Sequence, residues 1–211
     1  LAMDFDSDGD LDIVIAHLYG TPGRILINPG DGNFTSTTNS NTPNLQRYLT
    51  GSDFNNDGLL EFADAYYAGA WLNTGSTVTR RSNIYQLIGS NTLGPMDSGD
   101  LDGDGLDDVI ILHPSDTGAT DKTGAFVCFN KNAGTSFVRG PTLGRGEHLF
   151  RGVDLGDVDL DGDLDVFAVT AGSGLIYLND GKGNFRLSDQ NLTLSGANAV
   201  SLADFDKDGD L

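Results

Sequence analysis

The chain has 211 residues, with 31 acidic and 12 basic side chains and a formal net charge of −19 at pH 7. This charge argues against nucleic acid and anionic membrane surfaces as partners, because both are held through basic patches. The sequence contains no apolar run of the roughly 18 residues that a membrane span needs, and its single cysteine, Cys128, excludes an internal disulfide.

Five acidic segments share one pattern: a carboxylate or Asn at places one, three and five, and Gly at place six. In chain order they read DFDSDGDLD (Asp4–Asp12), DFNNDGLLE (Asp53–Glu61), DLDGDGLDD (Asp100–Asp108), DVDLDGDLD (Asp157–Asp165) and DFDKDGDL (Asp204–Leu211). Their first residues lie 49, 47, 57 and 47 positions apart. This spacing predicts a single repeat domain with repeats over residues 1–47, 48–94, 95–151 and 152–198, and a partial repeat over 199–211.

The pattern is typical of a loop that wraps a calcium ion. Calcium takes roughly six to eight oxygen ligands, and Gly at place six permits the sharp turn. Carboxylates at places one, three, five and nine and the main-chain carbonyl at place seven would form the shell; magnesium, which needs a stricter octahedron, fits less well. The expected ligand residues are Asp4, Asp6, Asp8, Asp10 and Asp12; Asp53, Asn55, Asp57, Leu59 and Glu61; Asp100, Asp102, Asp104, Leu106 and Asp108; Asp157, Asp159, Asp161, Asp163 and Asp165; and Asp204, Asp206, Asp208 and Asp210. We therefore expect about four complete Ca²⁺ sites and a partial fifth.

Two other interpretations compete with this one. The segments could be solvated acidic turns, but two carboxylates about 4 Å apart repel by about 4 kcal/mol at an effective dielectric near 20. We expect the loops to be ordered only with metal bound, so that folding and binding are coupled. An EF-hand needs Glu at place twelve and flanking helices, whereas place twelve is Ile15, Asp64, Ile111 and Ala168.

The segments between the loops read as strands. Each complete loop is followed by an apolar run rich in β-branched or aromatic residues, as in DIVIAHL and DDVIILH. A second run ends in Asn, over residues 24–28, 70–73, 125–130 and 175–179. Turns such as PGDGNF and DGKGNF then lead to Phe34, Phe137 and Phe185, which start a further strand. The second repeat has TGSTVT there, which predicts an altered hairpin. Four strands per repeat predict an all-β fold of β-propeller-type blades, with about four antiparallel blades and the start of a fifth.

The chain repeats a fixed series of features: DxDxDG, a strand, LN and GDGNF. This series resembles the FG-GAP or VCBS repeat, a family that includes the blades of the integrin α-subunit propeller and many secreted bacterial proteins. The resemblance implies a calcium ion in a hairpin loop of each blade, with ligands bound on the opposite face or at blade junctions. It also implies an extracellular or cell-surface location. The second repeat departs from the pattern at Asn55 and Glu61, and the fifth lacks place nine.

Few residues outside the loops suggest chemistry. Cys128 is in register with Leu26, Trp71 and Tyr177, which indicates a packing position rather than a nucleophile. His17 and His113 share the register of Tyr66 and Thr170, which favours ordinary strand residues over a polar ring, and His148 has no evident partner. Glycosylation sequons stand at Asn33 and Asn191.

Residues 1–11, LAMDFDSDGDL, match residues 201–211, SLADFDKDGDL. In a closed ring of four blades, both segments would compete for the same position. No signal peptide is visible and the chain starts at Leu1, which indicates a processed or partial chain. We expect part of a larger propeller, or pairing with neighbouring copies of the chain.

The predicted function is a calcium-binding module of a secreted or cell-surface protein, with a structural or adhesive role and a protein or carbohydrate partner. No catalytic motif is visible, so we do not expect an enzyme. The alternatives are a polysaccharide lyase, with candidates Arg80–Arg81 and the His148-containing region Arg139–Arg151, and a lectin with one sugar pocket per blade.

Overall fold

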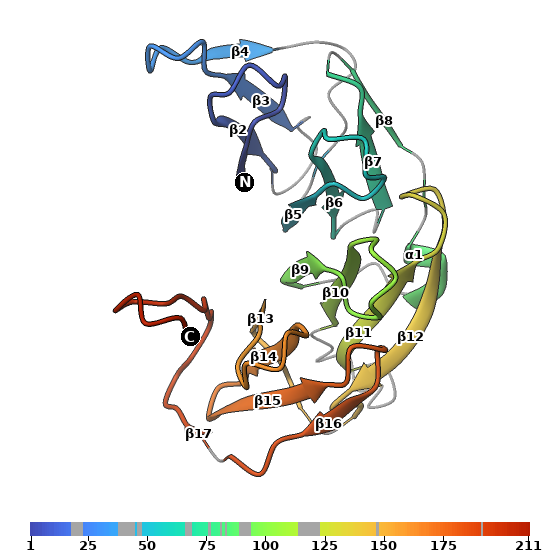
Figure 1. Ribbon diagram of the computed structural model, residues 1–211, viewed down its shortest axis with the longest axis vertical. Coiled ribbons are helices and arrows are strands. Elements are labelled where there is room, and N and C mark those ends of the chain that lie inside the picture. Colours follow the sequence, from blue (N-terminus) through green and yellow to red (C-terminus); the bar gives the residue numbers. More distant parts are fainter. Residues whose placement is uncertain are drawn as a thin grey trace.

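The computed structural model describes residues 1–17, 23–37, 45, 48–65, 69–75, 77–80, 82, 84–88, 94–113, 123–146, 148–190 and 192–211. These residues form four antiparallel sheets that follow one another along an arc (Figure 1). The first blade contains β1 (Ala2–Met3), β2 (Asp12–Ile15), β3 (Arg24–Ile27) and β4 (Thr35–Thr37), and the second β5 (Leu49–Ser52), β6 (Glu61–Asp64), β7 (Gly69–Asn73) and β8 (Val78–Arg80). The third contains β9 (Met96–Gly99), β10 (Asp108–His113), β11 (Gly124–Asn130) and β12 (Phe137–Leu143). The fourth contains β13 (Gly152–Gly156), β14 (Asp165–Val169), β15 (Ser173–Asn179), β16 (Phe185–Leu187) and the short β17 (Leu192–Thr193), which pairs with β15.

Within each blade the strands are ordered as they are in the chain, and every neighbouring pair is antiparallel. The predicted all-β fold of propeller-type blades is therefore confirmed. The second repeat still forms its outer strand β8, with Val78 at the position that Phe occupies elsewhere. Its turn is altered, as expected, and is closed by the amide of Thr74, which donates to the carbonyl of Thr77 at 3.0 Å.

The hydrophobic core lies between successive blades, because the middle strands of each blade pack against those of its neighbours. Three clusters of buried side chains fill the three junctions. Between the third and fourth blades, Ile110 and Val127 pack with Val166 and Tyr177. This arrangement explains why β10 is buried at every position and why its sequence is a continuous apolar run rather than an alternating one.

Residues 199–211 dock on the fourth blade in the way that the fourth blade docks on the third. The carboxylate of Asp97 in β9 accepts the amide of Leu155 in β13 at 2.9 Å, and the carboxylate of Asp154 in β13 accepts the amide of Leu202. The segment forms no strand, and its Phe205 is 93% exposed. It has the position of the first strand and loop of a further blade.

One helical turn, α1 (Tyr85–Ile88), is an element that the sequence pattern does not predict. It places Ile88, with the adjacent Ile84, in the core between the second and third blades. Over the described residues, no helix has the length and apolar character required to cross a membrane.

Candidate metal centres

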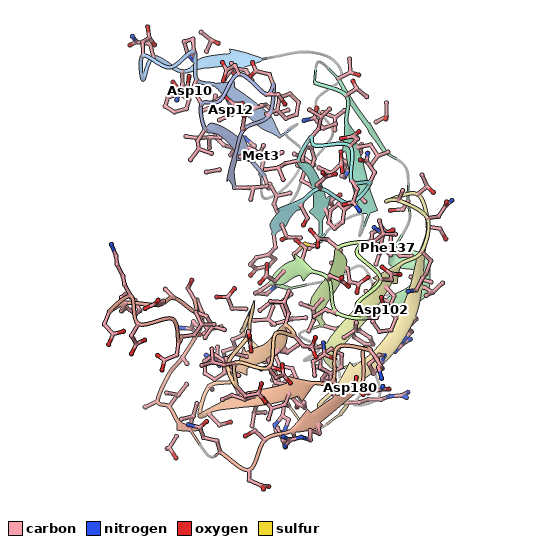
Figure 2. All side chains as sticks on the ribbon, viewed as in Figure 1. Met3, Asp10, Asp12, Asp102, Phe137 and Asp180 are labelled. Carbon is pink, nitrogen blue, oxygen red and sulfur yellow. The ribbon has the colours of Figure 1, made fainter. Side chains whose placement is uncertain are left out.

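The acidic segments form the loops between the first and second strands of the blades. Loop one (Asp4–Asp12) connects β1 to β2, loop two (Asp53–Glu61) connects β5 to β6, loop three (Asp100–Asp108) connects β9 to β10, and loop four (Asp157–Asp165) connects β13 to β14. Loop five (Asp204–Leu211) belongs to the segment docked on the fourth blade. Figure 2 shows Asp10 and Asp12 in loop one and Asp102 in loop three.

Glycine at place six closes each loop. Its φ lies between +83° and +100° in all five loops, and an added Cβ would meet nothing within 4 Å, so the backbone angle rather than space requires glycine. In this conformation its amide donates to the carboxylate at place one. The bonds run from Gly9 to Asp4 (3.1 Å), Gly58 to Asp53 (2.8 Å), Gly105 to Asp100 (2.9 Å), Gly162 to Asp157 (3.0 Å) and Gly209 to Asp204 (3.0 Å).

The carboxylate at place five makes a second recurring bond. One of its oxygens accepts the amide of place seven at 2.9–3.2 Å in all five loops. This contact turns the place-five side chain into the loop. The second oxygen of this carboxylate accepts the side-chain amide of Asn55 in loop two and the ammonium of Lys131 in loop three.

These bonds bring carboxylate oxygens together in four of the loops. In each of them, three carboxylates have oxygens within 4.8 Å of one another. The groups are Asp4, Asp6 and Asp8; Asp100, Asp102 and Asp108; Asp157, Asp159 and Asp165; and Asp204, Asp206 and Asp208. Places one and three therefore converge in all four, joined by place five or place nine.

Buried oxygens without a hydrogen-bond partner test whether a cation fits. One carboxylate oxygen each of Asp4, Asp6, Asp102 and Glu61 is buried and accepts no hydrogen bond. A buried carboxylate oxygen left unpaired is costly. Because all of these donors are hard oxygens crowded with like charge, they fit a hard divalent cation such as calcium.

The acid at place nine has a second task that sequence reasoning missed. In loop one, Asp12 accepts the amides of Phe5 at 2.8 Å and Asn28 at 2.7 Å. Asp108 and Asp165 make the same two bonds, to place two of their loop and to the Asn that ends the third strand. All three aspartates are fully buried. Each oxygen retains a lone pair, so these two hydrogen bonds are compatible with the predicted ligand role.

Loop two differs, as its sequence suggests. The side-chain amide of Asn55 donates to Asp57 at 3.0 Å and to Glu61 at 3.4 Å, while its oxygen accepts the amide of Asp57 at 2.9 Å. In this orientation an N–H group points at the carboxylates that would hold a cation. Ligation by Asn55 would require its amide to turn.

Burial and mutual repulsion oppose the ionised forms of several loop acids. Burial first, and then the charges of Asp57 and Asp53, raise the pKa of Glu61 to about 7. Burial is also the main reason why the pKa of Asp108 rises to about 7, and it raises the pKa of Asp6 together with Asp8 and Asp12. A bound cation would favour the ionised forms of these acids.

In two loops, the side chain at place seven lies against the turn between the third and fourth strands. An added Cβ on Gly30 would meet Asp10, and one on Gly181 would meet Asp163. Both glycines also have positive φ, at 82° and 66°. Gly30 of PGDGNF and Gly181 of DGKGNF thus leave room for the side chain at place seven of the loop. Because that side chain lies against the turn, the main-chain carbonyl remains the expected ligand at place seven.

The Asn that ends each third strand links neighbouring blades, a role that sequence reasoning also missed. Its side-chain amide donates to the place-two carbonyl of the preceding blade's loop: Asn73 to Phe5 (2.7 Å), Asn130 to Phe54 (2.7 Å) and Asn179 to Leu101 (2.9 Å). The same amide donates to place eight of its own blade at 3.0–3.2 Å. Its recurrence in the sequence was the available signal, but its partners lie 68, 76 and 78 residues away.

The other candidates occupy structural positions. Cys128 is fully buried opposite Val109, and burial raises its pKa to about 12, as expected of a packing residue. Trp71 donates its indole N–H to Asp64 at 2.6 Å. His113 is buried edge-on to Phe126.

The arginine-rich region does not converge on one point. Arg139 lies over the ring of Phe126 and donates to Thr142, whereas Arg151 donates to Asn198. His148 lies against the ring of Phe150. Arg81 and Asn191 fall outside the described residues, as does the side chain of Arg80, while Asn33 is exposed in the turn between β3 and β4.

Comparisons with known proteins bear on this arrangement. A family model described as FG-GAP-like repeat matches residues 4–63, 100–168 and 157–211. This confirms the predicted resemblance for FG-GAP repeats, and leaves the VCBS and integrin comparisons as predictions. No curated protein sequence matches the chain. Among solved structures, the chain is similar to part of a mutant Tc holotoxin pore of Photorhabdus luminescens, with 16% identity, a TM-score of 0.46, and coverage of 93% of this chain and 9% of that chain.

Proposed function

Because the chain belongs to the family of FG-GAP-like repeats, we propose that it is a calcium-binding propeller-type module whose loops hold calcium as a structural ion. The observation that carries the proposal is the set of buried carboxylate oxygens without partners at Asp4, Asp6 and Asp102. Each belongs to a loop in which carboxylates at places one and three converge. A calcium ion would neutralise these groups and supply the missing contacts.

The ion would act on the blade junctions. Place two of loops one and three is held on one side by the acid of place nine and on the other by the Asn of the next blade. Phe5 lies between Asp12 and Asn73. Leu101 lies between Asp108 and Asn179. Repulsion that opens a loop would therefore strain two blades at once. Calcium in loop one would hold the first and second blades in register.

For the whole protein we propose a structural or adhesive role at the cell surface or outside the cell, with protein or carbohydrate as the partner. The exposed Asn33 sequon is compatible with this location. We propose a non-catalytic role because Arg139 and Arg151, the candidates for a lyase site, are engaged in separate local contacts. A lectin with one sugar pocket per blade is the alternative.

Calorimetric titration of the EDTA-treated chain with calcium, followed in parallel by circular dichroism, tests the proposal. We expect uptake of about four ions, a gain of β-signal and weaker binding of magnesium. Asp159→Asn should remove uptake at loop four. The matched control Asp189→Asn, which changes an exposed acid outside the loops, should retain full uptake. No uptake up to about 1 mM calcium, the weak end for extracellular modules, would show that the loops are solvated turns.

A further inference from the structure

Loop three contains a cation of its own. The ammonium of Lys131, the first residue after β11, hydrogen-bonds to Asp102 at place three and to Asp104 at place five, the latter at 2.7 Å. Both contacts are ion pairs. They involve two of the positions from which calcium ligands are expected.

The lysine side chain lies beside an aromatic ring of its own blade, and the fourth blade packs on that ring. Its ammonium lies 5.5 Å from the centre of the Phe129 ring. The turn after β15 packs on the same place, because an added Cβ on Gly183 would meet both Phe129 and Asp102. Figure 2 shows Asp102 and Asp180 at this junction of the third and fourth blades. The side chain of Lys131 is 38% exposed, so its charge remains accessible to solvent and salt.

The other repeats have no cation at this position. The residue that follows the Asn of the third strand is Pro29 in the first repeat, Thr74 in the second and Asp180 in the fourth. Asp180 has the opposite charge to Lys131. Loops three and four therefore have nearly the same acidic sequence and opposite neighbours.

We propose that Lys131 is a tethered cation that competes with calcium at places three and five of loop three. The inference rests on the proposed function, that the loops bind calcium. Loop three then fills at higher calcium concentration than loop four, and keeps its closed form when calcium is withdrawn. The junction between the third and fourth blades would be the part of the molecule least sensitive to calcium.

The test follows single loops by NMR during a calcium titration of the EDTA-treated chain. The amides of Gly105 and Gly162, which close loops three and four, report each loop separately. In the wild type, Gly105 should respond at higher calcium than Gly162. Lys131→Met keeps the apolar stem, removes two ion pairs and should lower the Gly105 midpoint about tenfold, since an exposed pair contributes up to about fivefold. The Gly162 midpoint should not move.

Lys182→Met is the matched control, because Lys182 is an exposed lysine in the turn after β15 and its loss changes the net charge equally. It should leave the Gly105 midpoint in place. Equal wild-type midpoints for Gly105 and Gly162, or no effect of Lys131→Met on Gly105, would overturn the proposal. If no glycine amide responds to calcium in any variant, the proposed calcium function itself has failed.

Discussion

Place four of each loop has a left-handed backbone whatever residue occupies it. The residues are Ser7, Asn56, Gly103, Leu160 and Lys207, with φ between +57° and +73°. Of these, glycine and asparagine tolerate the conformation well, whereas a leucine in it loses about 1–2 kcal/mol. Leu160 is also 60% exposed, so packing does not compensate. The loop imposes this strain, because the bond from Gly162 to Asp157 fixes the turn on either side of it.

Leu160→Asn should raise the free energy of unfolding by about 0.5–1 kcal/mol, because asparagine adopts positive φ more readily than leucine. Loop two already has Asn56 at this place. The measurement is urea denaturation at saturating calcium. Leu160→Ala is the control, since it removes the same exposed side chain and keeps an unfavourable backbone residue. Equal stabilisation by both variants would mean that the exposed leucine, and not the backbone, was unfavourable.

Two carboxylates meet where the first strands of the third and fourth blades face each other. Burial first, and then a hydrogen bond with Asp154, raise the pKa of Asp97 to about 6 from its ordinary value of 3.8. The folded protein thus binds a proton between about pH 4 and 6 that the unfolded chain has lost. The contribution of Asp97 to stability is therefore largest below about pH 4 and is lost as pH rises toward 6.

Asp97→Asn should remove this dependence and stabilise the protein at pH 7 by about 1–3 kcal/mol. The asparagine oxygen can still accept the amide of Leu155, which Asp97 accepts at 2.9 Å. The free energy of unfolding is measured from pH 4 to 7 for the wild type and for the variant. The loop acids are the same in both proteins, so their pH dependence cancels when one free energy is subtracted from the other. A difference that is constant over this range would contradict the assignment.

At the scale of the strand, the Asn after each third strand determines how strongly one blade holds the next. Asn179 bonds to Leu101 of the third blade and to Leu164 of its own. In the first blade, the side-chain amide of Asn28 donates to the carbonyl of Leu11 at 3.3 Å. The two residues have the same register and differ in the presence of a preceding blade.

Asn179→Ala should destabilise the protein by about 2–3 kcal/mol, because it leaves two main-chain carbonyls at the junction without their donor. Asn28→Ala, the internal control, should cost about 1 kcal/mol or less. Both values follow from chemical denaturation at saturating calcium. Similar losses for the two variants would show that the bond between blades contributes little and that the turn after the strand carries the effect.

The strands and loops of this fold could be predicted because their signals are local and repeated. Apolar runs, Asp-Gly turns and the period of about fifty residues identify four strands per repeat, and the predicted register of Cys128 with Trp71 is the observed pairing position. Two sets of hydrogen bonds could not be predicted, because they depend on how separate strands and blades meet. Asp108 accepts the amides of Leu101 and Asn130, and Asn179 donates to Leu101 of the preceding blade. Lys131 gave no repeated signal, since it occurs in one repeat alone.

At the scale of the whole molecule, the arc ends in the first blade on one side and in the fourth blade, with residues 199–211 docked on it, on the other (Figure 1). On the first blade, Ile13, Ile15 and Leu26 are partly exposed, whereas their fourth-blade counterparts Val166, Ala168 and Tyr177 pack against the third blade. On the fourth blade, the opposite face borders a hollow of about 430 Å³. Its apolar lining includes Phe167, Ile176, Leu178 and Leu202. The two faces have the same character as those that meet at each junction within the chain.

We therefore expect copies of the chain to associate head to tail, with the first blade of one copy displacing residues 199–211 from the fourth blade of the next. Such a contact is heterologous and leaves a free face at each end. Sedimentation at saturating calcium should show association that grows with concentration. Leu26→Glu and Leu178→Glu should each give monomers, since each places a charge on one of the faces. Val138→Glu, at a residue that is 43% exposed on β12, should associate like the wild type.

A mixture of the two blocked variants distinguishes this contact from non-specific association. Leu26→Glu retains an intact fourth-blade face, and Leu178→Glu retains an intact first-blade face. One intact face of each kind permits a single contact, so the mixture should form dimers and nothing larger. A wild type that stays monomeric at high calcium and high concentration would exclude association through these faces. In that event the faces would instead fit further blades of the same repeat, because each junction within the chain joins surfaces of this kind.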